Sequence, residues 1–128
     1  MPFIRITALG PMLTAGQISR LNTEVTGLME SVLGKVAELT SVLVEQPESA
    51  RWTIGGIATP VAVHVDATVT AGTNKPEQKA LFVERTMTLL KNVFGPDLNP
   101  ATYVVVTEVP ANSWGYDGRT QESRRLLV

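Results

Sequence analysis

Apolar residues recur three and four positions apart in two long stretches of the chain, one ending at Gly34 and the other at Gly95. This spacing places the apolar side chains on one stripe of a helix, and glycine at the end of each stretch suits a left-handed residue that closes it. The stripe of the first stretch consists of Ile18, Leu21, Val25, Leu28, Met29, Val32 and Leu33. The pattern therefore predicts two amphipathic helices.

The starts of both helices carry capping signals. Thr14 is a suitable N-cap for the first helix, because its hydroxyl can accept a free backbone N–H of the first turn. Pro76 suits the opening turn of the second helix, with Thr73 or Asn74 as its cap.

Strands are predicted on both sides of each helix. Residues 61–70, "VAVHVDATVT", alternate valine or alanine with polar residues, which is the period of a strand with two different faces. Shorter runs of β-branched residues predict further strands near 2–7, 40–46 and 103–108. The order is strand, helix, strand, and it occurs twice.

An internal repeat explains that order. The segments 44–56 and 106–118 share a branched strand end, a proline, a tryptophan and a closing glycine, and the helices before them align with an offset of 61 residues. We interpret the chain as one domain made by tandem duplication, with a first repeat of about 1–59 and a second of about 60–128. Each repeat is a β-α-β unit.

Two such units define an α/β (α+β) fold. A β-α-β crossover makes its two strands parallel, so the two units predict a four-stranded mixed sheet with both helices on one face. We expect valines on the uncovered face and therefore burial of that face against other copies, as a homo-oligomer. Trp52 and Trp114 each lie in a glycine-containing turn, which predicts short hairpins that reach a neighbouring subunit.

Composition narrows the classes of function. The 128 residues have a net charge of −1, with no basic stripe, so we expect neither a nucleic-acid nor a membrane partner. No apolar run is long enough to span a bilayer and no signal peptide is evident, which predicts a cytoplasmic protein. The chain has no cysteine and one histidine, which disfavours thiolate chemistry, iron–sulfur clusters, zinc sites and a Ser-His-Asp triad. We expect no metal and no cofactor.

The chain opens with methionine followed by Pro2, at the edge of a predicted strand. Proline is tolerated as the first residue of a strand, where its missing N–H costs nothing. Removal of Met1 would instead give Pro2 a free secondary amine, which can take up and release a proton. Composition and pattern leave both interpretations open.

Four segments carry a resemblance to a known family: "MPFIRI", "PEQKALF", "TYVVVTEVPANSWGYDG" and "SVLVEQPESARWTIGG". In the order in which they follow one another along the chain, they resemble the 4-oxalocrotonate tautomerase group of the tautomerase superfamily, over nearly the whole chain and in the form of two fused units. The resemblance implies a homotrimer with a barrel of pseudo-sixfold symmetry. It also implies that Pro2, freed by removal of Met1, is the catalytic group, with one active site per chain.

The implied activity is keto-enol tautomerisation of a small enol or unsaturated oxo acid, without a cofactor. An amine in an apolar pocket favours its neutral form and can act as a general base at neutral pH. Neighbouring hydrogen-bond donors must then stabilise the negative charge that develops on the substrate oxygen.

The chain departs from the family pattern where the prototype holds its dicarboxylate substrate with arginines, since the corresponding second-strand positions fall at about Thr40 and Tyr103. Tyr103 offers a phenolic donor, and Trp114 lies where the family has an aromatic wall. We expect both to complete the pocket around Pro2. Lys75 and Arg119 are the candidate cations for a substrate carboxylate.

His64 and Asp66 lie two residues apart in the predicted strand 61–70 and so share one face. They are either a pair with acid–base function or, as is more common for one histidine on an inward strand face, hydrogen-bonded structure. Two other functions also stay open. One is hydration, dehalogenation or decarboxylation with a protonated Pro2 as acid, and the other is a non-catalytic trimeric scaffold.

Overall fold

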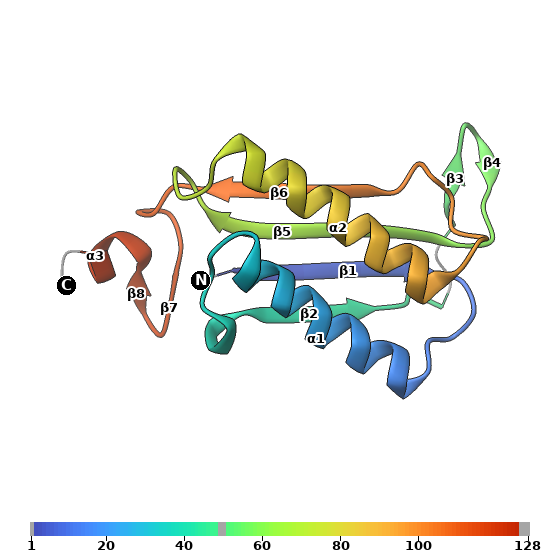
Figure 1. Cartoon of the computed structure of the whole chain (residues 1–128), viewed down its shortest axis with the longest axis horizontal. Helices are drawn as coiled ribbons and strands as arrows, with labels where there is room; N and C mark the ends of the chain where they lie inside the picture. Colours follow the sequence, from blue (N-terminus) through green and yellow to red (C-terminus); the bar gives the residue numbers. More distant parts are fainter. Residues whose placement is uncertain (1, 49–50, 126–128) are drawn as a thin grey trace.

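The computed structural model describes residues 2–48 and 51–125. Its main feature is a four-stranded sheet (Figure 1). The two central strands pair antiparallel, and each pairs in parallel with an outer strand of its own repeat. In order across the sheet, the strands are β2 (Ser41–Glu45), β1 (Phe3–Leu9), β5 (Ala62–Thr70) and β6 (Tyr103–Val109). The predicted mixed sheet of two β-α-β units is confirmed.

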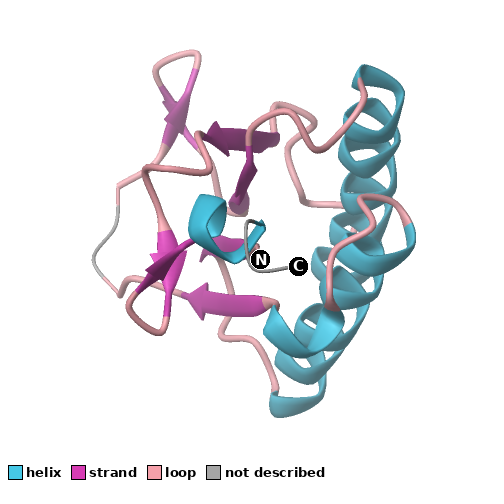
Figure 2. Cartoon of the chain, turned by 90° about the vertical axis from the view of Figure 1, so that its left-hand side faces the viewer, coloured by secondary structure: helices cyan, strands magenta, loops and turns pink. Residues whose placement is uncertain are grey.

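Helices α1 (Ala15–Ser31) and α2 (Pro76–Phe94) cover one face of this sheet (Figure 2). The core lies between the helices and the sheet, because the apolar stripes of both helices meet the inward side chains of the two central strands. The largest fully buried hydrophobic side chains are Phe82, Ile4, Ile6, Leu21, Met29, Leu90, Val25, Val63, Val65 and Val69. No helix in the described part of the chain has both the length and the hydrophobicity needed to cross a membrane.

The predicted cap of α1 is confirmed. The Thr14 hydroxyl accepts the Gln17 N–H at 3.1 Å, and the Gln17 side-chain oxygen accepts the Thr14 N–H at 2.9 Å. This reciprocal pair is a capping box and satisfies two of the backbone donors at the start of the helix.

The predicted cap of α2 is wrong, although Pro76 does begin the helix. Lys75 is the N-cap residue, and its N–H donates to the Gln78 side-chain oxygen at 2.8 Å. Asn74 has another role, since its side-chain amide donates to the Leu33 carbonyl at 2.8 Å and to the same Gln78 oxygen at 3.2 Å. Asn74 therefore connects the start of α2 to the turn that follows α1.

The uncovered face of the sheet is partly polar. The expectation that it carries valines is wrong for β5, although Val105 of β6, which pairs with Asp66, lies on this face. The β5 valines all point toward the helices, which leaves His64 and Asp66 on the open face. These two side chains are therefore not directed inward as expected. The open face holds a hollow of about 470 Å³, lined by Phe3, Arg5, Thr7, Glu45, His64, Asp66, Thr68 and Thr107.

Hydrogen bonds organise this open face. The Arg5 guanidinium lies 2.9 Å from the Glu45 carboxylate, which also accepts the Thr7 hydroxyl at 2.9 Å. Asp66 accepts the Thr107 hydroxyl at 3.0 Å. Side chains of a β-strand alternate between its two faces. Because the β5 valines are buried under the helices, the polar residues that alternate with them in β5 lie on the open face.

Each repeat ends in a small hairpin, as predicted. The turn residues have positive φ, at Gly55 and Gly56 in the first hairpin and at Asp117 and Gly118 in the second, as tight two-residue hairpin turns require. The hairpins lie at opposite ends of the sheet (Figure 1). They consist of β3 (Thr53–Ile54) with β4 (Ile57–Ala58), and of β7 (Gly115–Tyr116) with β8 (Arg119–Thr120). Two short helices were not predicted, the 3-10 helix η1 (Ala37–Leu39) and α3 (Gln121–Arg125).

An ion pair joins α2 to β6. The Lys79 ammonium lies 2.6 Å from the Glu108 carboxylate, which also accepts the Gly72 N–H at 3.4 Å. The hydrogen bond from Lys79, followed by that from Gly72, lowers the pKa of Glu108 below its ordinary value of 4.5. Through these two hydrogen bonds, Glu108 of β6 holds α2 and the loop between β5 and α2.

The buried hydroxyl of Thr86 generates a first prediction. Thr86 is 1% exposed, and its hydroxyl has no hydrogen-bond partner in the part of the chain that the structure describes. Thr86→Val replaces this hydroxyl by a methyl group of similar shape, so we expect it to raise the free energy of unfolding by about 1 kcal/mol. Urea denaturation measures the change. Thr88→Val is the matched control, because the exposed Thr88 hydroxyl donates to the Glu84 carbonyl at 3.2 Å. If Thr86→Val proved less stable than wild type, the absence of a partner would be contradicted.

Glu108 generates a second prediction. A carboxyl whose pKa is lower in the folded than in the unfolded chain stabilises the fold above its ordinary pKa, and this stabilisation is lost as pH falls through the folded-state pKa. We therefore expect Glu108→Gln to be less stable than wild type at neutral pH and the difference to vanish in acid, below pH 4.5. Urea denaturation across this pH range measures it. Glu84→Gln, an exposed change on α2, should show no such pH-dependent difference. A constant difference at all pH values would exclude the ion pair as its cause.

Candidate functional site

Pro2 lies immediately before β1, and its side chain is fully buried. Its carbonyl accepts the Ser41 N–H at 3.1 Å, which fixes the start of β1 against the start of β2. A cavity of about 330 Å³ opens beside it, lined by Pro2, Phe3, Ser41, Thr68, Trp114 and Gly115. At this Pro2 cavity, the start of the first repeat meets the second repeat.

Strand pairing brings these residues together. Phe3 pairs with Ser41 in the parallel pair and with Thr68 in the antiparallel pair. The starts of β1 and β2 and the end of β5 therefore lie at the same end of the sheet. The β7–β8 hairpin follows β6 at that end of the sheet (Figure 1). Gly115 of this hairpin and the preceding Trp114 form one wall of the cavity. Both repeats therefore contribute to the cavity.

Trp114 is held by two hydrogen bonds. Its indole N–H donates to the Thr70 hydroxyl at 3.1 Å, and its carbonyl accepts the Gln121 N–H at 2.9 Å. The next residue must be glycine, because a Cβ on Gly115 would lie 1.8 Å from the Arg119 carbonyl oxygen. The close approach of β7 and β8 thus sets the position of the aromatic wall.

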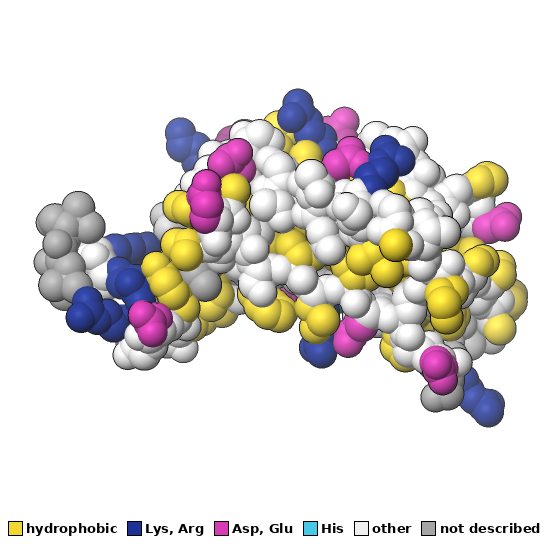
Figure 3. Space-filling model, turned by 90° about the horizontal axis from the view of Figure 1, so that it is seen from below, with side chains coloured by type: hydrophobic (Ala, Val, Ile, Leu, Met, Phe, Trp, Pro, Cys, Tyr) yellow, Lys and Arg dark blue, Asp and Glu magenta, His cyan; other side chains and the backbone are white. Residues whose placement is uncertain are grey.

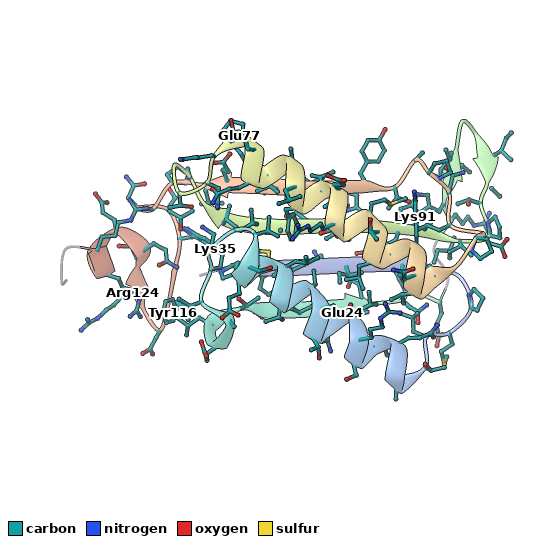
Figure 4. The ribbon with its side chains drawn as sticks, in the orientation of Figure 1. Glu24, Lys35, Glu77, Lys91, Tyr116 and Arg124 are labelled. Carbon is teal, nitrogen blue, oxygen red and sulfur yellow. The ribbon has the colours of Figure 1, made fainter. Side chains whose placement is uncertain are left out.

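Helix α3 holds this hairpin from the outside. The Arg124 guanidinium lies 3.7 Å from the centre of the Tyr116 ring and donates to the Tyr116 carbonyl at 2.8 Å (Figure 4). Lys and Arg side chains gather at this end of the molecule (Figure 3). Asp117 and Glu122 lie in the same segment, so basic and acidic side chains both surround the hairpin beside the Pro2 cavity.

The lining of the Pro2 cavity is apolar with two hydroxyl groups. Phe3, Trp114 and the Pro2 ring supply the apolar surface, and Ser41 and Thr68 supply the hydroxyls. In the part of the chain that the structure describes, no charged residue lines this cavity. Apolar surroundings of this kind disfavour the charged form of an amine. The described residues contain no group of three His, Cys, Asp or Glu side chains arranged to hold a metal ion.

Lys35 is connected to Trp114 through the β5–α2 connection. Its ammonium donates to the Thr73 hydroxyl at 2.8 Å, and that hydroxyl donates to the carbonyl of Thr70, the partner of the indole. Burial lowers the pKa of Lys35, and the Glu108 carboxylate opposes this by favouring the ammonium. The sequence analysis missed this lysine, since nothing local distinguishes it from a solvated residue after a helix.

The structure separates the predicted site residues. Trp114 lines the Pro2 cavity, and Arg119 lines a neighbouring hollow of about 310 Å³ that shares Trp114 and Gly115 with it. Lys75 is exposed at the start of α2 and does not line the cavity. Tyr103 lies at the opposite end of the sheet and is 71% exposed, so within one chain it does not complete the pocket around Pro2.

Phe3, Ser41 and Thr68 also line the Pro2 cavity but were not predicted. Phe3 was recognisable as the neighbour of Pro2 in the sequence. Ser41 and Thr68 depend on the register of two strand pairs, which the strand patterns alone do not determine.

Comparisons with known proteins agree with this geometry. Residues 62–124 match the Tautomerase family model, described as tautomerase enzyme. No protein with a curated description matches the sequence. Among solved structures, the chain is similar to a fused 4-OT, a wild-type asymmetric trimer, with a TM-score of 0.82 and 19% identity over 95% of this chain and 98% of that one.

Two other solved structures share the fold. One is Pt0534 inactivated by 2-oxo-3-pentynoate, with a TM-score of 0.83 and 13% identity over 95% of this chain and 98% of that one. The other is N1, a member of the cis-3-chloroacrylic acid dehalogenase family, with a TM-score of 0.81 and 15% identity over 98% of this chain and 91% of that one. The second repeat of the chain thus matches the tautomerase family, and nearly the whole chain shares the fold of a fused 4-OT.

Proposed function

We propose that this protein is a cofactor-independent keto-enol tautomerase in which Pro2, after removal of Met1, is the general base. One observation carries the proposal: Pro2 is fully buried beside a cavity of about 330 Å³ with an aromatic wall and two hydroxyls. The substrate is a small enol or unsaturated oxo acid, which a cavity of this size accommodates.

The chemistry requires a free amine. An unperturbed α-amino group has a pKa of about 7.7–8.0, and the apolar lining lowers it, so the neutral amine dominates at neutral pH. The amine takes the proton of the enol hydroxyl. The ammonium so formed then gives a proton to the far carbon of the enol C=C bond, two bonds from the oxygen. The enol thereby becomes a ketone with no net change in protons. The Ser41 hydroxyl is the donor available to the developing oxyanion, because the Thr68 hydroxyl donates to Asp66 at 3.3 Å.

A substrate carboxylate needs a cation that the lining of the Pro2 cavity lacks. Arg119 is the proposed partner, because the hollow it lines shares Trp114 and Gly115 with the Pro2 cavity. We assign Lys75 to substrate binding only through a neighbouring copy, because it does not line the Pro2 cavity of its own chain. Tyr103 lines a different cavity, at the other end of the sheet.

A second candidate function is hydration, dehalogenation or decarboxylation with a protonated Pro2 as acid. The shared fold with a member of the cis-3-chloroacrylic acid dehalogenase family supports considering it. Activation of water in such a reaction calls for a base, and among the described residues no carboxylate lines the Pro2 cavity. The pH dependence separates the two, because a base must be deprotonated and an acid protonated.

The first prediction of this proposal concerns Pro2. Mass spectrometry of the intact native protein should show loss of Met1, since only then is the nitrogen a basic amine rather than an amide. Pro2→Ala leaves a primary amine, so we expect kcat/KM for phenylenolpyruvate ketonisation to fall by about 10- to 100-fold rather than the larger losses of a removed base. Pro60→Ala, an exposed loop change, is the control and should leave activity unchanged.

Labelling provides an independent readout. 2-Oxo-3-pentynoate is an electrophile, so the wild-type amine should add to its triple bond and increase the mass of the N-terminal peptide. A processed wild type with the same activity as Pro2→Ala, or with no activity on any enol, would overturn the proposal in favour of the scaffold.

The second prediction concerns assembly. We propose a homotrimer, because the open sheet face carries the exposed hydrophobic side chains of Phe3 and Leu43, and a fused 4-OT of the same fold is a trimer. Light scattering should give about three times the chain mass of 13.8 kDa. Leu43→Glu places a charge on the open face and should shift the protein toward monomer, whereas Val83→Glu on the exposed side of α2 should not. A stable monomeric wild type at micromolar concentration would contradict the proposal.

A further inference from the structure

The sheet contains a second arrangement equivalent to the one around Pro2. Phe3 pairs with Ser41 on one side and with Thr68 on the other. His64 pairs with Tyr103 on one side and with Thr7 on the other. An approximate twofold axis between β1 and β5 therefore places His64 where the first repeat has Phe3, and Tyr103 where it has Ser41.

A cavity of about 260 Å³ lies at this equivalent position. Trp52 stands before the β3–β4 hairpin as Trp114 stands before β7–β8, and its carbonyl accepts the Thr59 N–H at 3.2 Å as the Trp114 carbonyl accepts Gln121. The residues that define this second cavity are Trp52, Thr53, Val63, His64, Ala101 and Tyr103. The duplication has thus produced two cavities, one at each end of the sheet.

The second cavity cannot repeat the chemistry proposed for the first. Val63 replaces Pro2, and its nitrogen is an amide inside β5, with a delocalised lone pair that does not accept protons. The cavity has gained an imidazole and a phenol instead. Within the described chain, neither the His64 ring nor the Tyr103 hydroxyl makes a hydrogen bond, whereas the adjacent Asp66 accepts two from Thr68 and Thr107.

We propose that the second cavity is a non-catalytic binding site for a small aromatic carboxylate. The ring of the ligand packs against the Trp52 indole, and its carboxylate accepts hydrogen bonds from the His64 ring and the Tyr103 hydroxyl. These two side chains supply donors with no internal partner, and the size of the cavity suits one ring and one carboxylate. The site does not depend on the activity proposed for Pro2.

The two tryptophans make the site directly measurable, because the chain has only two and each lines one cavity. In Trp114→Phe, Trp52 is the sole tryptophan and reports the second cavity. Titration with benzoate should give a saturable change in its fluorescence. Benzamide, which has the same ring without the negative charge, should bind at least about tenfold more weakly, since hydrogen bonds to a charged group are the stronger ones.

Variants in the Trp114→Phe background identify the donors. Tyr103→Phe removes only a hydroxyl from a 71% exposed side chain, so the fold is preserved, and it should weaken benzoate binding by about tenfold. His64→Ala should weaken it by as much or more, with circular dichroism confirming the fold. Pro2→Ala should leave benzoate binding unchanged, which separates this site from the proposed activity.

Two-dimensional NMR gives a second measurement, in which both tryptophans of the wild type are kept. Benzoate should shift the indole N–H signal of Trp52 with a saturable dependence that Tyr103→Phe weakens. A Trp52 signal that does not saturate with benzoate, or the same affinity in Tyr103→Phe and His64→Ala as in wild type, would overturn the proposal.

Discussion

The antiparallel pairing of β1 with β5 is the constraint on which the rest of the structure depends. Each repeat can form its own β-α-β unit, but a two-stranded parallel pair with one helix buries too little surface to be stable alone. Joining the two units through their first strands produces one sheet with both helices on one face and a continuous core. The same pairing brings Thr68 beside Phe3, so it also builds the Pro2 cavity.

Local patterns were sufficient to predict the elements and their order. The helical stripes and the alternation in residues 61–70 depend on side chains only a few positions apart, and the structure confirms both helices and all four main strands. Helix α3 escaped prediction because a helix of one turn is not stable by itself. It is held by the contact of Arg124 with Tyr116, which no short-range pattern reveals.

The wrong predictions concern features that depend on tertiary packing, namely which face of a strand the helices cover and which residues lie at the same end of the sheet. Alternation shows that β5 has two different faces, but it does not show which face the helices cover, and so the valines were assigned to the open side. Tyr103 is the first residue of β6, and Trp114 follows the end of that strand. The strand between them runs the length of the sheet, so within one chain they lie at opposite ends.

The positions of Pro2 and α3 have a practical consequence for work with this protein. The start of β1 forms the Pro2 cavity, and α3 holds the hairpin that walls it, so both ends of the described chain lie at one end of the sheet (Figure 1). An affinity tag or fused fluorescent protein at either end would crowd the same opening, and one attached before Pro2 would also convert its nitrogen to an amide. The glycine turn at Gly55 and Gly56 lies at the far end, in a surface hairpin. A label inserted there would leave the Pro2 cavity open.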